Sequence, residues 1–170
     1  MVNDFVLLGP AADPAHIRGL KDAARALARI AKVHAPFVSR GDESGTHMKE
    51  RALWKKAETK PAGGWYLEIG QGMGAVLTMT NEKQAYALCD RATYLARGTR
   101  LKLEVLVEGD PELLNYYSAI QVNPARFAAV KADLARRLIG WFCTAEGQKL
   151  IGDYSVGGNQ LFRPACISGK

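Results

Sequence analysis

The sequence predicts an α/β fold, because short apolar segments of strand length alternate with segments whose apolar residues recur at helical spacing. Of the 170 residues, 48% are hydrophobic, which is enough for a core and excludes a disordered or low-complexity chain. No apolar run approaches the ~18 residues of a membrane span. The absence of long linkers argues against two domains in series, but it permits two lobes that share strands.

The first half of the chain predicts two strands, each followed by a helix. The expected elements are a strand over 3–8 ended by Gly9-Pro10, a helix from Asp13-Pro14 to about His34, a strand over 37–39 and a helix beginning at 44–46. The apolar face of the first helix comprises Leu20, Ala23, Ala24, Leu27, Ile30 and Ala31. In the second helix we expect Met48, Ala52, Leu53 and Trp54 to face inward.

The second half continues the alternation and ends in helices. The expected elements are a helix after the glycine-rich turn 70–74, strands over 85–89, 104–108 and 117–122, and a helix capped by Asp90. A strong helical face follows, made by Phe127, Val130, Leu134, Leu138, Trp141 and Phe142. The segment 145–154, AEGQKLIGDY, predicts a shorter final helix.

Positive charge is concentrated in one segment. The net charge is +6, and residues 18–60 hold 11 of the 23 Lys and Arg but only 5 of the 17 Asp and Glu. This charge is typical of a solvated helix face, and it also favours attraction of an anion. Nucleic acid is a poorer fit, because the basic run has neither interleaved aromatic residues nor a zinc-finger or RNP-like motif.

Cysteines, histidines and motifs give no support for a metal site or an enzyme. Cys89, Cys143 and Cys166 are odd in number, widely spaced and form no CxxC, so we expect neither a disulfide framework nor a zinc site. The three histidines lack metal-ligand spacing, and no GxSxG or HExxH motif is present. We therefore expect no metal, no cofactor and no enzymatic activity. The first ten residues lack the features of a signal peptide.

The segment SRGDESGTH, residues 39–47, is the strongest candidate site. A strand leads through Gly41 into a helix whose first residues are Ser44, Gly45 and Thr46. The first turn of a helix has unpaired N–H groups and a positive dipole, so it can bind an anion. Gly45 lets an oxyanion approach the backbone, the hydroxyls of Ser44 and Thr46 can donate, and Arg40 offers a fork of donors. Equally, Ser44 or Asp42 could serve only as a helix cap while Arg40 pairs with Asp42 or Glu43.

A second glycine-rich strand-to-helix turn, GQGMG, covers residues 70–74. It is neither a P-loop nor a convincing dinucleotide-binding motif, since no GK[ST] follows and the third glycine comes too early. By itself it is typical of a tight turn with close helix packing. Two such helix starts in one domain would suit one small anion held between them.

With these segments in view, the chain resembles the tungstate-binding proteins of bacterial ABC uptake transporters, which have the type II periplasmic-binding-protein fold. The resemblance covers nearly the whole chain. Its most specific parts are FVSRGDESGTH at 37–47 and WYLEIGQGMGAVLTM at 65–79, and it also includes NDFVLLGP at 3–10, AYALCDRATYL at 85–95, EVLVEGDPELLN at 104–115, AEGQKLIGDY and GGNQLFRP.

The resemblance implies two α/β lobes that close on a tetrahedral oxyanion, tungstate or molybdate. It implies oxyanion ligation by Arg40, Ser44, Gly45 and Thr46, with backbone donors from Met73 and Gly74. An ABC transporter permease would be the partner, and the family's location would be periplasmic or extracellular. Without a signal peptide, this chain would be cytoplasmic if expressed as it stands.

The chain departs from the family pattern at Tyr116, where the family often has Pro, and at its start. In the family, the segment NDFV…GP is a crossing strand reached after much of the first lobe. We therefore expect one complete lobe plus the C-terminal part of the other: a crossing strand over 1–9, the second lobe over 10–122, and helices of the first lobe over 123–170.

Such a truncated chain would bind weakly unless another chain completed the pocket. The alternative is a non-binding remnant with an interaction role, such as a homodimer.

Overall fold

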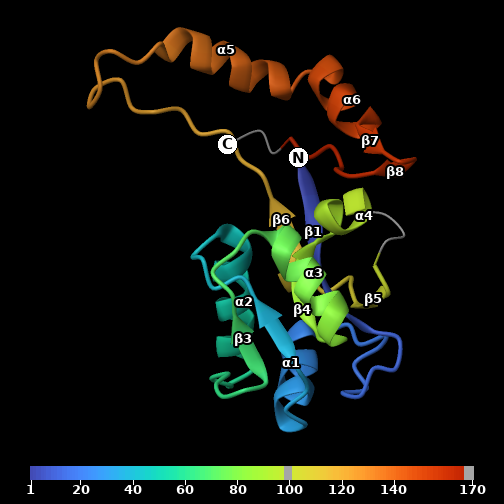
Figure 1. Ribbon diagram of the computed structural model, residues 1–170. Helices are drawn as coiled ribbons and strands as arrows, with labels where there is room; N and C mark the ends of the chain where they lie inside the picture. Colours follow the sequence, from blue (N-terminus) through green and yellow to red (C-terminus); the bar gives the residue numbers. More distant parts are fainter. Residues whose placement is uncertain (98–100, 167–170) are drawn as a thin grey trace. The chain divides into compact units, whose positions relative to one another are not determined.

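The computed structural model describes residues 1–97 and 101–166, and strands alternate with helices through most of it (Figure 1). This confirms the predicted α/β class. The chain divides into two compact units. The larger comprises Asp4–Leu114, and the smaller comprises Met1–Asn3 with Asn115–Lys170. The larger unit contains the candidate site.

The larger unit is built on β1 (Val2–Pro10), which pairs antiparallel with β4 (Ala87–Asp90) and β5 (Leu103–Val107). Side chains of a strand alternate between its two faces. Phe5 and Leu7 accordingly enter one apolar cluster, whereas Val6 and Leu8 enter another. The strand is therefore buried on both faces, which explains its nearly continuous apolar sequence.

Helices cover both faces of this sheet. One cluster includes apolar residues of α1 (Ala23–Lys32) and α2 (Gly45–Lys56), such as Leu27 and Leu53. The other includes Met73, Val76 and Leu77 of α3 (Met73–Lys83). The short α4 (Arg91–Arg97) follows β4, and Asp90 accepts a hydrogen bond from the Thr93 N–H, as expected of a cap (2.9 Å).

The strands that lead into the candidate site are parallel. β2 (Phe37–Ser39) pairs with β3 (Tyr66–Glu68) in register Phe37–Tyr66 to Ser39–Glu68. An additional bridge joins Phe37 to Tyr86, just before β4. Because the strands are parallel, their carboxyl ends lie at the same edge, and the loops into α2 and α3 start side by side (Figure 1).

The start predicted for the first helix is wrong: α1 begins at Ala23, not near Pro14. Asp13 and His16 both have positive φ, which no helix tolerates. The Asp13 carboxylate instead accepts hydrogen bonds from the Arg18 N–H (2.9 Å) and the Tyr86 hydroxyl (2.8 Å), and this stabilises a turn. Asp22 provides the actual cap.

The inward face of α2 was also predicted only in part. Leu53 and Trp54 are buried as expected, but Met48 is 53% exposed and Ala52 is exposed. The buried positions in the first half of this helix are instead His47 and Glu50. A search for apolar periodicity cannot find these positions, because both residues are polar.

Strand β6 (Leu114–Tyr116) begins at the last residue of the larger unit and leads into the smaller one. The smaller unit contains α5 (Ala132–Phe142), α6 (Ala145–Asp153) and a hairpin of β7 (Ser155–Val156) and β8 (Asn159–Gln160). The prediction of a strand over 117–122 is wrong, because the strand in this region, β6, ends at Tyr116. The single helical turn η2 (Pro111–Leu113) of the larger unit precedes β6. Phe127 and Val130 precede α5 instead of belonging to it. The final helix is confirmed.

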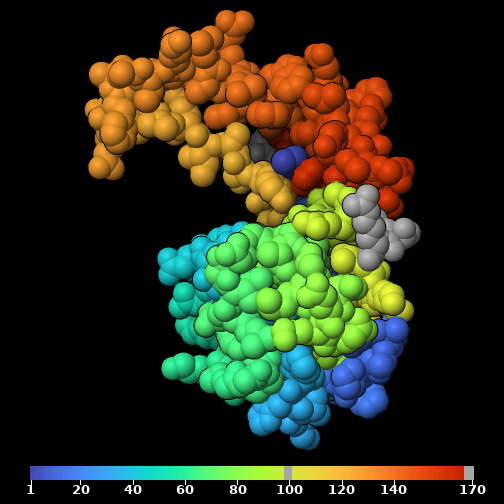
Figure 2. Space-filling model, in the orientation of Figure 1, coloured from blue at the N-terminus to red at the C-terminus, as the bar shows by residue number. Residues whose placement is uncertain are grey.

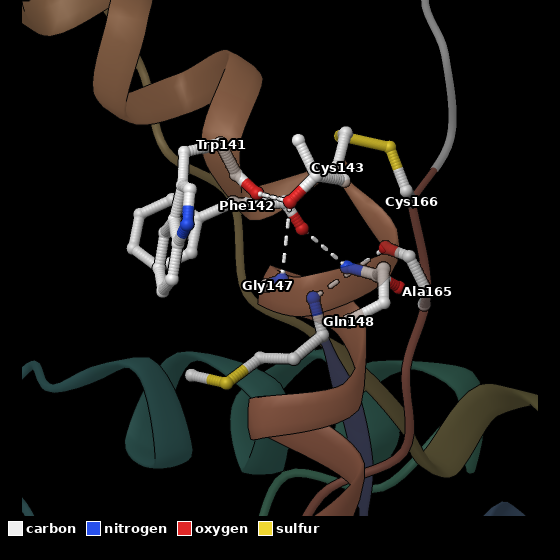
Figure 3. Close-up of a disulfide and its surroundings, with 9 residues drawn as sticks. Trp141, Phe142, Cys143, Gly147, Gln148, Ala165 and Cys166 are labelled. Atoms are coloured by element: carbon white, nitrogen blue, oxygen red, sulfur yellow. Dashed lines mark hydrogen bonds between the residues drawn. A yellow bond between two sulfur atoms is a disulfide. The ribbon is translucent and has the colours of Figure 1, made fainter.

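A disulfide joins Cys143 to Cys166 within the smaller unit, with Cα atoms 5.3 Å apart (Figure 3). The expectation of no disulfide framework is therefore corrected for this pair, while Cys89 is free and buried. Close by, the Gln148 side chain donates to the Phe142 carbonyl (2.6 Å), and Arg163 pairs with Val2 through two backbone hydrogen bonds (2.9 and 3.0 Å). The disulfide thus ties the C-terminal segment, which pairs with the start of β1, to the end of α5.

Candidate functional site

The loop between β2 and α2 makes a tight turn that requires glycine at one position. Gly41 has φ +61°, and a Cβ there would lie only 2.9 Å from the Cβ of Glu68. Both the left-handed backbone and the close approach to β3 therefore exclude other residues. Glu43 also adopts positive φ, +57°. These two left-handed residues turn the chain from the end of the strand into the start of the helix.

Arg40 is bound to Asp42 in this structure. The Nη2 of Arg40 lies 2.6 Å from the Oδ2 of Asp42, and its Nε lies 3.1 Å from the same oxygen. The side chains are 20% and 22% exposed. Hydrogen bonds from Arg40, and then from Ser44, hold the pKa of the Asp42 carboxyl well below its usual range. The ion pair between Arg40 and Asp42, which the sequence analysis gave as the alternative to anion binding, is thus present. Within the described residues the Nη1 of Arg40 has no hydrogen-bond partner.

Most backbone N–H groups around the start of α2 donate hydrogen bonds to side chains, and two N–H groups do not. The Ser44 hydroxyl accepts from the His47 N–H (3.4 Å), so Ser44 is the N-cap. Asp42 accepts from the Ser44 N–H (3.2 Å). Across the described part of the chain, no acceptor faces the N–H of Gly45 or of Thr46. A Cβ built on Gly45 would meet nothing within 4 Å, so open space adjoins these donors.

The start of α3 likewise has two backbone N–H groups that donate to no acceptor among the described residues. Gly72 is its N-cap, and its carbonyl accepts from the N–H groups of Ala75 and Val76 (3.0 and 3.3 Å). The N–H groups of Met73 and Gly74 have no acceptor among the described residues. Both glycine-rich segments singled out from the sequence therefore end in a helix with two available backbone donors.

The two loops lie against each other. The Ile69 N–H donates to the Ser39 carbonyl (3.2 Å), and a Cβ on Gly41 would lie 3.5 Å from the Gly70 nitrogen. The predicted residues Arg40, Ser44, Gly45, Thr46, Met73 and Gly74 accordingly come from two adjoining loops at one edge of the β2–β3 pair.

Arg97 is a cation near this edge that sequence reasoning missed. A methyl group on Gly74 would overlap the Arg97 guanidinium, so the two residues are neighbours. Arg97 makes no ion pair with any residue in the described ranges 1–97 and 101–166. Twenty-odd residues separate it from Gly74, so no local pattern could have indicated this proximity.

A buried carboxyl lies one turn into α2. Glu50 is 2% exposed, and its Oε1 accepts hydrogen bonds from the Tyr66 hydroxyl (2.8 Å) and the Trp54 indole (3.1 Å). Burial raises the pKa of Glu50 to about 7, although Tyr66, Ser39 and Trp54 partly oppose this shift. Burial, and next the Glu50 charge, raise the pKa of Tyr66 above its usual value. The hydrogen bond between Glu50 of α2 and Tyr66 of β3 thus links these two elements.

The raised pKa of Glu50 makes folding stability depend on pH. The unfolded chain releases this proton near pH 4.5, whereas the folded chain keeps it to about pH 7. The folded state therefore loses about 3 kcal/mol of stability as pH rises through this window. We expect urea unfolding followed by tryptophan fluorescence to show this loss, and the Glu50→Gln variant to be nearly insensitive to pH there. The exposed Glu82→Gln is the control, and an equal slope in E50Q would contradict the prediction.

Two further properties concern the whole described chain. Residues 1–97 and 101–166 contain no group of three or more His, Cys, Asp or Glu that could hold a metal ion. None of the helices described is long and apolar enough to cross a membrane. The candidate site is a set of backbone hydrogen-bond donors and guanidinium groups, and such groups can bind an anion.

Residues 1–146 match the PBP superfamily domain, so the chain belongs to the PBP superfamily. It is 45% identical to the tungstate-binding protein of Desulfovibrio alaskensis, whose structure it matches with a TM-score of 0.86 over 98% of this chain and 69% of that one. It is also 50% identical to the tungstate ABC transporter protein of Geobacter sulfurreducens (TM-score 0.77, 91% of this chain, 66% of that one).

Curated proteins agree with this assignment. The chain is 42% identical to the tungstate-binding protein of Peptoclostridium acidaminophilum over 96% of its own length and 59% of that protein. It spans 51 to 62% of the length of the curated relatives that it matches. The predicted resemblance to tungstate-binding proteins and the predicted type II periplasmic-binding-protein-like fold are thereby confirmed. Two of these relatives are described as tungstate-binding proteins.

Proposed function

We propose that this chain binds a tetrahedral oxyanion, tungstate or molybdate, as the solute-binding component of an ABC uptake system. One observation carries the proposal: the backbone N–H groups of Gly45, Thr46, Met73 and Gly74 have no acceptor among residues 1–97 and 101–166, and they lie at the adjoining starts of α2 and α3. A tetrahedral dianion needs several donors converging from different directions, and two helix starts supply them together with their dipoles.

Side chains complete the proposed site. Arg40 retains the Nη1 donors that Asp42 does not use, and Asp42 holds the guanidinium plane in place. The Thr46 hydroxyl adds a neutral donor, and the Ser44 hydroxyl, which also interacts with Asp42, can donate to the anion if its O–H turns from Asp42. Arg97 contributes positive charge beside Gly74. Each hydrogen bond to a charged oxygen stabilises a complex by about 1.5–3 kcal/mol, so these donors together can select a dianion over a neutral solute.

The direct test is isothermal titration calorimetry of the chain with sodium tungstate, sodium molybdate and sodium sulfate. We expect heat from tungstate and molybdate that saturates at one anion per chain, and weaker or no binding of sulfate, which is smaller. Absence of saturable heat with both larger anions, from the micromolar to the millimolar range, would reject the proposal. Titration of molybdate into the tungstate-bound chain then shows which of the two anions binds with higher affinity.

Gly45 allows a prediction that separates binding from folding. We expect Gly45→Ala to leave the unfolding temperature unchanged or slightly higher, because the new methyl group meets no atom within 4 Å. It should weaken tungstate binding about tenfold or more, since the methyl group occupies space where the oxyanion approaches the Gly45 and Thr46 N–H groups. Gly64→Ala, which also meets no neighbour, is the matched control. Equal affinities of both variants would contradict this role for Gly45.

We also propose that the chain works in an oxidising compartment, the periplasm or the extracellular space, and docks on an ABC transporter permease. The Cys143–Cys166 disulfide supports this location, because disulfides persist outside the reducing cytosol. The similarity to proteins of ABC transporters supports a permease as the partner. Pull-down with the purified permease subunits of a tungstate ABC transporter would test the partner, and a chain that is not retained would contradict it.

A second candidate is an interaction role, with a homodimer as the simplest form. It is favoured by α5, which has no buried residue, although Leu134 and Leu138 are apolar and 56% and 54% exposed. Figure 2 shows this segment, in orange, at the surface of its unit. Light scattering distinguishes the candidates: a monomer that binds tungstate leaves no support for the dimer, whereas a dimer without anion affinity supports it.

A further inference from the structure

The His47 side chain forms the least expected contact of the candidate site. Its Nδ1 lies 3.0 Å from the Glu43 nitrogen and accepts the N–H of that residue. A ring nitrogen that accepts a hydrogen bond carries no proton, so the neutral imidazole holds its proton on Nε2. His47 is 5% exposed, and its Nε2 has no hydrogen-bond partner among the described residues; the nearest carboxylate oxygen, on Glu68, is 3.7 Å away.

This contact completes a reciprocal cap at the start of α2. The Ser44 hydroxyl accepts from the His47 N–H, while the His47 ring accepts from the residue that precedes Ser44. The arrangement resembles a capping box, in which the third helical residue returns a hydrogen bond to the chain before the helix. Here histidine occupies the place of the usual Glu or Gln, and the ring holds Glu43 in its left-handed conformation.

The cap determines which backbone donors remain available. The ring of His47 occupies the Glu43 N–H, Asp42 occupies the Ser44 N–H, and Ser44 occupies that of His47. Among the residues that the structure describes, the consecutive N–H groups of Gly45 and Thr46 are the ones left without an acceptor at this helix start. Loss of the ring acceptor would leave the Glu43 N–H without its partner and release a left-handed residue that ordinary side chains disfavour. The direction of the two available N–H groups would then no longer be defined.

We propose that His47 is a positioning residue for the anion site: its unprotonated Nδ1 holds the turn in the conformation that directs the Gly45 and Thr46 N–H groups at the ligand. This inference rests on the proposed oxyanion function. His47 itself does not contact the anion in this proposal. The contribution comes from preorganisation, because a turn already held in its binding conformation loses less entropy when the ligand binds.

Two substitutions distinguish the acceptor from the bulk of the side chain. Asn places its amide oxygen where Nδ1 lies, one bond from Cγ, and so retains an acceptor; Leu has similar size but no acceptor. By calorimetry with tungstate, we expect His47→Leu to lose about tenfold in affinity and His47→Asn to stay within about threefold of the original chain. Met48→Ala, at an exposed position of the same turn, is the control.

A second measurement requires no ligand. In ¹⁵N NMR spectra we expect the imidazole of His47 to show the Nε2–H tautomer, and the Glu43 amide to be protected from hydrogen exchange in the original chain and in H47N but not in H47L. Protection that persists in H47L, or equal tungstate affinities of H47L and the original chain, would overturn the role of His47. An original chain that binds no tungstate but shows the expected exchange pattern would instead reject the proposed function.

Discussion

Replacing Arg40 by Glu should abolish oxyanion binding. The substitution removes the guanidinium donors and places a carboxylate beside the incoming dianion, so attraction becomes repulsion. Loss of two charge-assisted hydrogen bonds alone corresponds to more than about a hundredfold in affinity. The measurement is calorimetry with tungstate and molybdate at low and moderate salt, since screening would weaken a purely long-range effect but not the loss of direct contacts.

The controls for Arg40 address charge and folding separately. Arg25→Glu makes the same change in net charge on an exposed position of α1 and should leave binding intact. Arg40→Lys keeps the charge but loses the planar fork that Asp42 now holds, so we expect intermediate affinity. Circular dichroism and thermal unfolding establish that each variant is folded. Undiminished affinity of a folded R40E would remove Arg40 from the site.

The second large effect concerns the Cys143–Cys166 disulfide. Its two cysteines are 23 residues apart, and for a loop of this length the chain-entropy treatment gives about 3 kcal/mol of stabilisation. The smaller unit depends on this link because α5 buries no residue and α6 buries only Gly147. We therefore expect Cys143→Ser, or reduction with dithiothreitol, to unfold the smaller unit at a markedly lower temperature while the larger unit is retained.

Hydrogen exchange with mass spectrometry resolves the two units. Peptides from residues 132–166 should lose protection on reduction, whereas those covering β1, β4 and α3 should not. In the Cys143→Ser variant dithiothreitol should have no further effect, which shows that the reductant acts on this bond and not on the buried Cys89. Unchanged protection of 132–166 after complete reduction would indicate that packing alone maintains the smaller unit.

The proposed site was largely predictable because its signals are local. A strand, a glycine with a tight turn and a capped helix start occupy nine consecutive residues at 39–47, and each depends on backbone geometry that neighbouring residues determine. The same holds for residues 70–74. Only the structure could show that the N–H groups of Gly45, Thr46, Met73 and Gly74 lack acceptors within the described part of the chain, because a side chain distant in sequence could have occupied them.

The sequence by itself determined the α/β class, the family resemblance, the start of α2 and the residues proposed to bind an oxyanion, and it placed the start of α3 two residues too late, after the turn 70–74 instead of at Met73. It misplaced the start of α1, where Asp13 and Tyr86, 73 residues apart, form a hydrogen bond that stabilises a turn. Only the tertiary structure decided the parallel pairing of β2 with β3, the burial of His47 and Glu50, the position of Arg97 beside Gly74 and the pairing of Cys143 with Cys166. Each of these depends on residues distant in sequence, and local periodicity and propensity contain no information on which distant residues meet.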